Sequence, residues 1–259
     1  MSIFARFQSI EENDKAAVVR KLMENSTPDF DFFYITGLAV LMATFGLLLD
    51  SPAVVIGSML IAPVLYPVLG IALGLVMSNP SVLGRSMVTL TKSFGIGIAL
   101  ATVATIIFSQ IDAGGFVLTN EIQHRIEPGI LYFFVALVAG AAVSFVLGQP
   151  EWSETLPGIA ISVALIPPLA VVGIGIAQLN LQVIGGSLIL LLLNFFGIIF
   201  SAFVTFSLMN LYEKQHIAES TIKKVEERIE RENEAIAAAD ESYKEHTEEI
   251  TGNGATEHS

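Results

Sequence analysis

The stretch Pro52-Ala-Val-Val-Ile-Gly-Ser-Met-Leu-Ile-Ala-Pro63 recurs 105 positions later as Pro157-Gly-Ile-Ala-Ile-Ser-Val-Ala-Leu-Ile-Pro-Pro168. Both copies are apolar, begin with a proline and carry a second proline eleven residues on. A duplicated helix that is interrupted within a membrane is typical of a transport or binding site. These two stretches therefore predict a protein made of two related halves.

The composition predicts a protein that crosses a membrane several times. Of the 259 residues, 53% are hydrophobic and 15% are charged, whereas soluble domains carry about 25% charged residues. A helix of roughly 20 apolar residues spans the hydrocarbon core. Six segments are long and apolar enough, and they lie near 32–49, 52–77, 88–110, 129–148, 157–178 and 183–210.

Lysine and arginine predict how these segments are oriented. With the N-terminus inside, 12 of the 13 basic residues fall on the cytoplasmic side and only Arg125 falls outside. Because cytoplasmic loops are rich in Lys and Arg, both termini are predicted to be cytoplasmic, in the cell (inner) membrane. Segments 2 and 5 then run in opposite directions. We therefore predict an all-α membrane protein whose six transmembrane helices, two of them broken by proline, form inverted repeats over 32–110 and 129–210.

The two ends of the chain are predicted to lie outside this 32–210 membrane domain. Residues 1–31 are expected to form a cytoplasmic helical segment, 211–240 a cytoplasmic helix and 241–259 a disordered acidic tail. The 211–240 helix has a heptad-like seam. It indicates either a stalk that pairs subunits in a homo-oligomer or a helix that lies on its own subunit. The seam consists of Leu208, Leu211, Ala218, Ile222, Val225, Ile229 and Ile236. Thirteen acidic against six basic residues in 212–259 argue against a nucleic-acid partner.

Proline removes the hydrogen bond to the carbonyl four residues earlier. Pro63 and Pro67 should therefore free the carbonyls of Met59 and Pro63, and the pair Pro167-Pro168 should free two more in the second stretch. Eleven residues of helix after Pro52 or Pro157 reach about 16 Å, close to the middle of the bilayer. Backbone without partners is tolerated there only inside protein or along a wet cavity.

These positions define the candidate pathway for a small solute or ion. It comprises Gly57, Ser58, Met59, Pro63, Tyr66, Pro67, Ser162, Val163, Ala164, Pro167, Pro168 and Asn194. The alternative is two kinked helices whose carbonyls are satisfied by hydroxyls, by Asn194 or by water. Asn194, an amide in an apolar segment, either joins this site or bridges two helices, and the structural role is favoured.

Other kinds of chemistry have few candidates among the membrane segments. No Asp, Glu, Lys, Arg or His lies between Ser51 and Gly84 or between Thr155 and Tyr212, which disfavours proton coupling through a buried carboxylate. All four histidines lie outside the spans and cysteine is absent, so we expect no metal site and no cofactor. No membrane-embedded nucleophile and base form a pair, so we expect no enzyme.

The connection between the two halves carries a charged pair. Glu121 and Arg125 are spaced i,i+4, the distance at which side chains pair on a helix. They form either the outer mouth of the pathway or a staple within the loop.

Three motifs resemble those of DUF389, a family of uncharacterised hydrophobic membrane proteins. They are the stretch 51–70, the stretch 156–173, and Asn194 in its apolar setting, and Glu121, Arg125 and Pro128 are similar to the family pattern as well. Ser58 and Ser162 stand where the family pattern implies alanine. The resemblance covers about 32–210 and implies the fold and the topology, but no substrate.

The function that these features favour is passage of a small solute or ion through the paired breaks. The rival is a membrane scaffold or sensor that does not transport and acts through its cytoplasmic helix.

Overall fold

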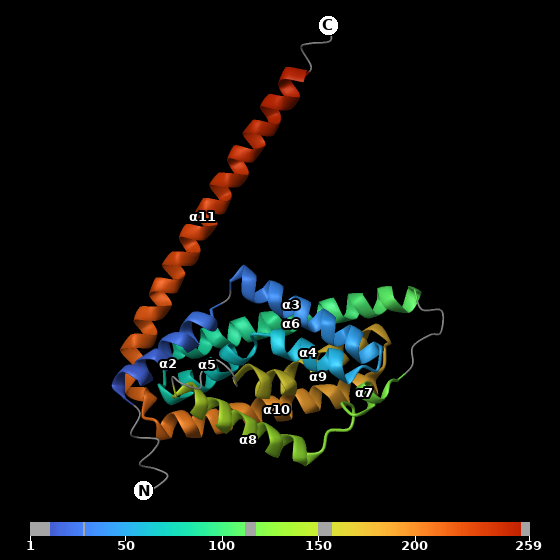
Figure 1. Cartoon of the computed structure of the whole chain (residues 1–259), viewed down its shortest axis with the longest axis vertical. Coiled ribbons are helices and arrows are strands. Elements are labelled where there is room, and N and C mark those ends of the chain that lie inside the picture. Colours follow the sequence, from blue (N-terminus) through green and yellow to red (C-terminus); the bar gives the residue numbers. More distant parts are fainter. Residues whose placement is uncertain (1–10, 28, 112–117, 150–156, 255–259) are drawn as a thin grey trace.

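The computed structural model describes residues 11–27, 29–111, 118–149 and 157–254, without the side chains of 111, 157–164 and 240–254. The regular elements of this part of the chain are helices (Figure 1). In order they are α2 (Glu12–Asn25), α3 (Phe30–Leu48), α4 (Pro52–Ile61), α5 (Leu65–Val76), α6 (Pro80–Ile111), α7 (Asn120–Gln123), α8 (Ile130–Leu147), α9 (Pro157–Ala177), α10 (Leu181–Leu208), the 3₁₀ turn η2 (Leu211–Lys214) and α11 (Gln215–Gly254).

Helix α9 occupies the centre of the bundle. It packs against α3, α4, α5, α6, α8 and α10, and every described side chain from Leu165 to Ile174 is buried. A helix that is apolar all round belongs in a core, which is what this stretch supplies. Helix α2 lies at one end of the bundle and α7 at the other, while α11 extends away from it (Figure 1).

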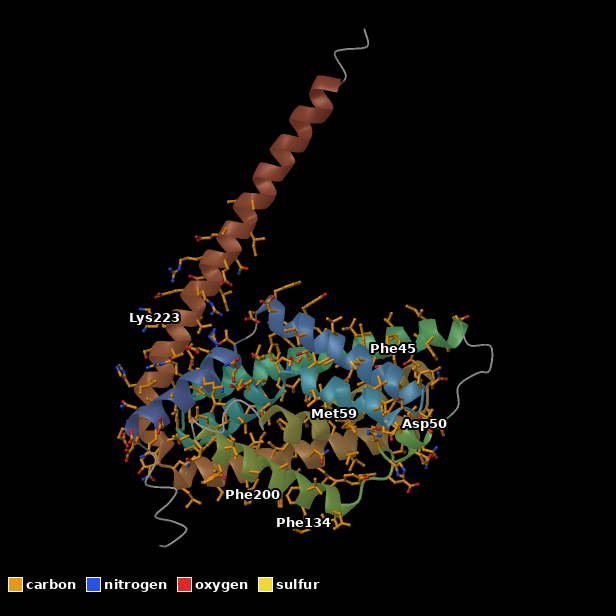
Figure 2. All side chains as sticks on the ribbon, viewed as in Figure 1. Phe45, Asp50, Met59, Phe134, Phe200 and Lys223 are labelled. Carbon is orange, nitrogen blue, oxygen red and sulfur yellow. The ribbon has the colours of Figure 1, made fainter. Side chains whose placement is uncertain are left out.

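The outside of the bundle is apolar, as expected for a protein surrounded by lipid. Phe134 and Phe200, labelled in Figure 2, are more than half exposed. Four helices, α3, α6, α8 and α10, are long and apolar enough to cross a membrane, and the bent pair α4–α5 makes a fifth span if it is counted as one. The protein is therefore a helical membrane protein. The six predicted spans are confirmed only in part, because the described apolar section of α9, Leu165–Ala177, is shorter than a span.

The predicted break in the first proline stretch is confirmed. Helices α4 and α5 meet at an angle of 54°, and Ala62 between them is extended, with φ −72° and ψ 121°. The ring of Pro63 disfavours helical geometry at the residue before it and leaves no N–H for the carbonyl of Met59. Pro67 does not break the chain, because it lies in the first turn of α5, where proline is tolerated.

The predicted break in the second stretch is wrong. Helix α9 runs unbroken from Pro157 to Ala177 with Pro167 and Pro168 inside it. Adjacent prolines remove two N–H donors from one turn, but six neighbouring helices pack against α9. Tertiary packing here outweighs the local preference.

Three of the turns between helices share one backbone conformation. Each has a left-handed residue followed by a residue whose N–H donates to a glycine carbonyl five positions earlier. The left-handed residues are Asp50, Ser78 and Leu179, with φ of 52°, 50° and 52°. The hydrogen bonds are Ser51 to Gly46 (2.9 Å), Asn79 to Gly74 (3.0 Å) and Asn180 to Gly175 (2.9 Å). A methyl group on any of these glycines would lie within 3.0 Å of a backbone nitrogen nine residues ahead, so only glycine permits this approach.

These turns explain why only one of the two stretches is broken. Gly74 and Gly175 occupy the same place in their turns and are 101 residues apart, whereas Pro52 and Pro157 are 105 apart. The first stretch therefore contains four more residues than the second, about one turn of helix. The chain accommodates that extra turn as the break between α4 and α5.

Contacts at the α7 end fix the directions of the two stretches. Asp50, just before α4, accepts a hydrogen bond from the backbone N–H of Glu121 in α7 (2.9 Å). Ser187, near the start of α10, donates to the carbonyl of Arg125 (3.1 Å). Helix α4 therefore begins at the α7 end and α9 finishes there, so the two run in opposite directions.

The C-terminal helix is longer than its composition predicts. We expected disorder after residue 240, but α11 continues to Gly254. The stretch after 240 keeps strong helix formers such as Glu and Lys up to the glycines at 252 and 254. At its other end α11 packs on α2, and ion pairs join Lys214 to Glu12 and Arg85 to Glu226.

Candidate functional site

A cavity of about 360 Å³ opens among α4, α7, α8, α9 and α10. It will be called the large cavity, in contrast to a smaller one near Pro63 described below; a shallower apolar groove of about 510 Å³ between α3 and α6 lies apart from both. Its volume is at the lower end of the range for small-molecule sites. The lining residues divide into a rim at the α7 end (Glu121, His124, Arg125, Tyr132), an apolar wall (Val135, Ala136, Ala139, Leu190) and a deep end (Met59, Pro168, Asn194).

The α7 segment that forms the rim is anchored to the turn between α3 and α4. The hydroxyl of Thr119 donates to the carbonyl of Leu47 (2.7 Å), and the side-chain amide of Asn120 donates to Asp50 (2.8 Å). Together with the N–H of Glu121, these contacts place Asp50 (Figure 2) beside the rim. The N–H of Glu121, and then the amide of Asn120, lower the pKa of the Asp50 carboxyl.

The predicted pair at the rim forms. A guanidinium nitrogen of Arg125 lies 2.8 Å from a carboxylate oxygen of Glu121, and the two side chains are 18% and 16% exposed. The two charges neutralise one another. The hydroxyl of Ser187 in α10 donates a hydrogen bond to the backbone carbonyl of Arg125. The Glu121–Arg125 pair thus links two turns of its own segment and also lines the mouth of the cavity.

The deep end joins three predicted residues from three helices. Met59 lies in the last turn of α4 and is 2% exposed, Pro168 is buried in α9, and Asn194 in the middle of α10 is 5% exposed. Figure 2 shows Met59 within the bundle. Residues 135 positions apart in the chain therefore meet in one cavity that also reaches the predicted mouth.

Several predicted pathway residues lie elsewhere. The hydroxyl of Ser58 donates to the carbonyl of Val55 in its own helix (2.6 Å). Gly57 faces α3, where a methyl group would meet the end of Met42 at 3.0 Å. Tyr66 packs against the core and Pro67 is buried in α5. Pro167 is buried in α9 and is not among the lining residues.

The side chains of Ser162, Val163 and Ala164 lie outside the described residues. The carbonyl of Pro63, predicted to be freed by Pro67, accepts a hydrogen bond from the N–H of Tyr66 (3.4 Å).

A second cavity of about 190 Å³, the small cavity, reaches Pro63 from the α2 end. Glu24, Asp29 and Asp31 are among its lining residues. Asp29 accepts the N–H of Phe32 (2.8 Å) as the N-cap of α3, and Asp31 lies in the first turn of that helix. Acidic groups stabilise a helix N-terminus, so these two carboxylates have a structural explanation.

The two cavities approach the break in the first stretch from opposite sides. Met59 lines the large cavity and Pro63 the small one. The two residues are four positions apart in the chain, across the end of α4 and the extended Ala62. The side chain of Val64, at the break, is fully buried. None of the described residues lines both cavities, so a thin layer of chain separates them.

The sequence did not predict the wall of the large cavity. Helix α8 supplies Tyr132, Val135, Ala136 and Ala139, and these residues resemble ordinary apolar residues of a span. Ala136 belongs to a run of small residues that indicates close helix packing, but no local signal marks it as part of a cavity. Within the described residues, no group of three or more His, Asp or Glu side chains forms a candidate metal site.

The comparisons with known proteins agree with the sequence motifs. The family model for a domain of unknown function, DUF389, matches residues 59–200, more than half of the chain. An uncharacterized protein of Methanocaldococcus jannaschii is 32% identical over 174 residues, which cover 66% of this chain and 51% of the relative. The chain therefore spans about half the length of this curated relative. No solved structure matches the chain significantly. The protein belongs to the DUF389 family.

Proposed function

We propose that this member of the DUF389 family carries a small solute or ion across the cell membrane, with the large cavity as its binding site. The observation that carries the proposal is that one cavity joins Met59, Pro168 and Asn194 to the charged pair Glu121–Arg125. A site in the middle of the membrane domain is thereby connected to one end of the bundle, as a transport site requires.

The proposed topology is six spans arranged as two inverted repeats, with both termini in the cytoplasm. The opposite directions of α4 and α9 support the inversion. The matching turns at Gly74 and Gly175 support descent from one duplicated unit. The excess of Lys and Arg at the α2 end supports a cytoplasmic location for that end. The large cavity then opens to the outside and the small cavity to the inside.

In this proposal the thin layer at Ala62–Val64 acts as the gate. On the proposed topology, this arrangement would be a state open toward the outside and closed toward the inside. A change of the 54° angle between α4 and α5 would move the end of α4 relative to α9 and connect the binding site to the small cavity. Hinges between helix segments produce such closures in many proteins.

We further propose that the protein is not an enzyme and needs no cofactor. Apart from the rim, the residues that line the large cavity comprise one amide and apolar side chains. Such a lining can bind a molecule but supplies no nucleophile and base. The lipid bilayer is the proposed surrounding partner, and the acidic tail speaks against nucleic acid.

A pair of tryptophan variants in α8 tests the transport proposal. Ala139 lines the large cavity, whereas its neighbour Val138 points away and is 71% exposed. In proteoliposomes assayed for solute and ion flux, Ala139→Trp should abolish the flux of the wild-type protein because the indole fills the cavity. Val138→Trp should leave it intact. Equal flux through both variants, or none through the wild-type protein over a broad panel of solutes and ions, would refute the proposal.

A second candidate function, an oligomeric scaffold, is favoured by the projecting part of α11. Ile222 and Val225 are buried against the body of the protein. The same seam continues to Ile229 and then to Ile236, which lies in a stretch, 231–239, whose residues are all exposed. A single helix that packs on nothing is marginally stable in water. We propose that a second copy of the chain pairs with this seam, as in a coiled coil.

Cross-linking tests this pairing, because the native chain has no cysteine. Ile236→Cys should give a disulfide-linked dimer under mild oxidation. Glu234→Cys, on the opposite face of α11, should remain monomeric. If neither variant forms dimers, or both form them equally, α11 does not pair through this seam.

A further inference from the structure

No charged side chain lines the inner part of the large cavity. The lining residues beyond the rim are apolar except for Asn194. The charges at the rim, Arg125 and Glu121, already pair with one another at 2.8 Å. An ion that moved from water to the deep end would exchange its hydration shell for the amide of Asn194 and the carbonyl of Met59, with no opposite charge beside it, and an unpaired charge in apolar surroundings is very costly. The cavity therefore discriminates against ions.

The shape of the cavity sets the size of its ligand. Along α8, Tyr132 at the rim and Ala139 near the deep end are seven residues apart, which corresponds to about 10 Å. With a volume of about 360 Å³, the cavity accommodates a short chain or a single ring. Its apolar wall suits a hydrocarbon body. Asn194 already has a partner within the protein, but a carboxamide has two donor hydrogens and an acceptor oxygen, so it can also bind a polar end.

The cavity also reaches the lipid-facing surface of α8. Val135 is a wall residue and is 63% exposed, and it lies on the same apolar face of the helix as Leu131 and Val138. A molecule with an apolar body, dissolved in the outer part of the bilayer, would meet this side of the cavity directly. A molecule dissolved in water would enter past Arg125 and Glu121.

We infer that the ligand of the large cavity is a small uncharged molecule with an apolar body and one hydrogen-bonding end, which Asn194 binds. The identification of this ligand as the transported solute rests on the proposed function, while its binding does not. Inorganic ions and charged metabolites are excluded as ligands of the deep end.

Protection of an introduced cysteine tests the inference without a transport assay. In Ala139→Cys, the new thiol lines the cavity and can be alkylated by a maleimide. Straight-chain primary amides should slow alkylation, and each added methylene should strengthen protection about fourfold until the cavity is filled. Ammonium and carboxylate compounds of the same chain length, and alkali-metal or magnesium chlorides, should give no protection.

Two controls and a second variant make the test specific. Val138→Cys, on the exposed face of α8, reports partition of the amides into lipid and should not be protected. Asn194→Leu, combined with Ala139→Cys, should weaken protection by the amides at least tenfold, because it removes the hydrogen-bonding partner. Thermal unfolding of this double variant shows whether it remains folded, and Asn194→Ala, which also lacks the amide, replaces it if it does not.

The outcomes separate this inference from the transport proposal. Protection by charged compounds or ions equal to that by amides would overturn the inference, even if flux is observed. Protection by amides without any flux would overturn the transport proposal and leave the ligand class standing. Short soluble amides and long amides delivered in vesicles distinguish entry from water and entry from the bilayer.

Discussion

Replacing Gly186 by alanine should displace the segment that carries the rim of the large cavity. A methyl group on Gly186 would lie 2.0 Å from the carbonyl oxygen of Ile126 and 2.8 Å from its carbonyl carbon. An ordinary contact begins at 3.4 Å, so the turn between α7 and α8 must move by about 1.4 Å. The adjacent Gly185 has nothing within 4 Å of such a methyl group and is the matched control.

The size of the effect follows from three contributions. Overpacking costs about 1–3 kcal/mol. Movement of the turn also breaks the 3.1 Å hydrogen bond from Ser187 to the carbonyl of Arg125, which costs about 0.5–1.5 kcal/mol. Alanine stabilises a helix relative to glycine by roughly 0.5–1 kcal/mol, but this gain is common to both variants. Gly186→Ala should therefore be about 1.5–4.5 kcal/mol less stable than Gly185→Ala.

Unfolding in mixed micelles, followed by far-ultraviolet circular dichroism against the mole fraction of dodecyl sulfate, measures this difference. Gly185→Ala should match or slightly exceed the wild-type stability, whereas Gly186→Ala should unfold at a distinctly lower mole fraction. If the two variants agree within about 0.5 kcal/mol, the close contact between α10 and Ile126, and with it the position of the rim, is wrong.

Two further predictions concern the rim and the packing of α8. Folding lowers the pKa of the Asp50 carboxyl, so its contribution to anchoring α7 is complete above the pKa of the unfolded chain and is lost as the pH falls through the lower folded value. Hydrogen exchange at the backbone amide of Glu121 should therefore lose protection below about pH 4. The variant Asp50→Asn should remove this pH dependence. In α8, Gly140→Ala would place a methyl group 2.2 Å from the hydroxyl oxygen of Ser201 and 2.9 Å from the Cα of Ile198. It should lower the stability of the protein by about 1–3 kcal/mol in the same unfolding assay. The control Gly95→Ala, whose methyl group meets nothing within 4 Å, should leave the stability unchanged or slightly higher.

Much of the fold was predictable because its signals are local. Apolar length predicts the spans, and the ends of α3, α8 and α10 lie within about two residues of the predicted segments. Pro63 predicts the break because a proline ring acts on the residue immediately before it. Met59, Pro168 and Asn194 were identified from proline chemistry and from one amide in an apolar segment, and they meet at the deep end.

The remainder depends on contacts between distant parts of the chain. Pro167 and Pro168 carry the same local signal as Pro63, but the helices around α9 keep it continuous. The α8 wall and the small cavity exist only after α8 packs on α10 and α2 approaches α3. Nothing in the sequence of Val135 or Ala139 distinguishes a cavity wall from a lipid-facing surface.

The four extra residues of the first stretch suggest how the two halves divide their roles. If both proline stretches were broken, either half could move against the other. Here α9 is an unbroken helix packed on six neighbours, whereas α4 is short, partly exposed to lipid at Leu60 and joined to α5 by the extended Ala62. Packed cores resist continuous deformation, so a conformational change is expected at the break rather than in α9. On the proposed function, Pro168 and Asn194 form the fixed side of the binding site, and Met59 belongs to the part that moves.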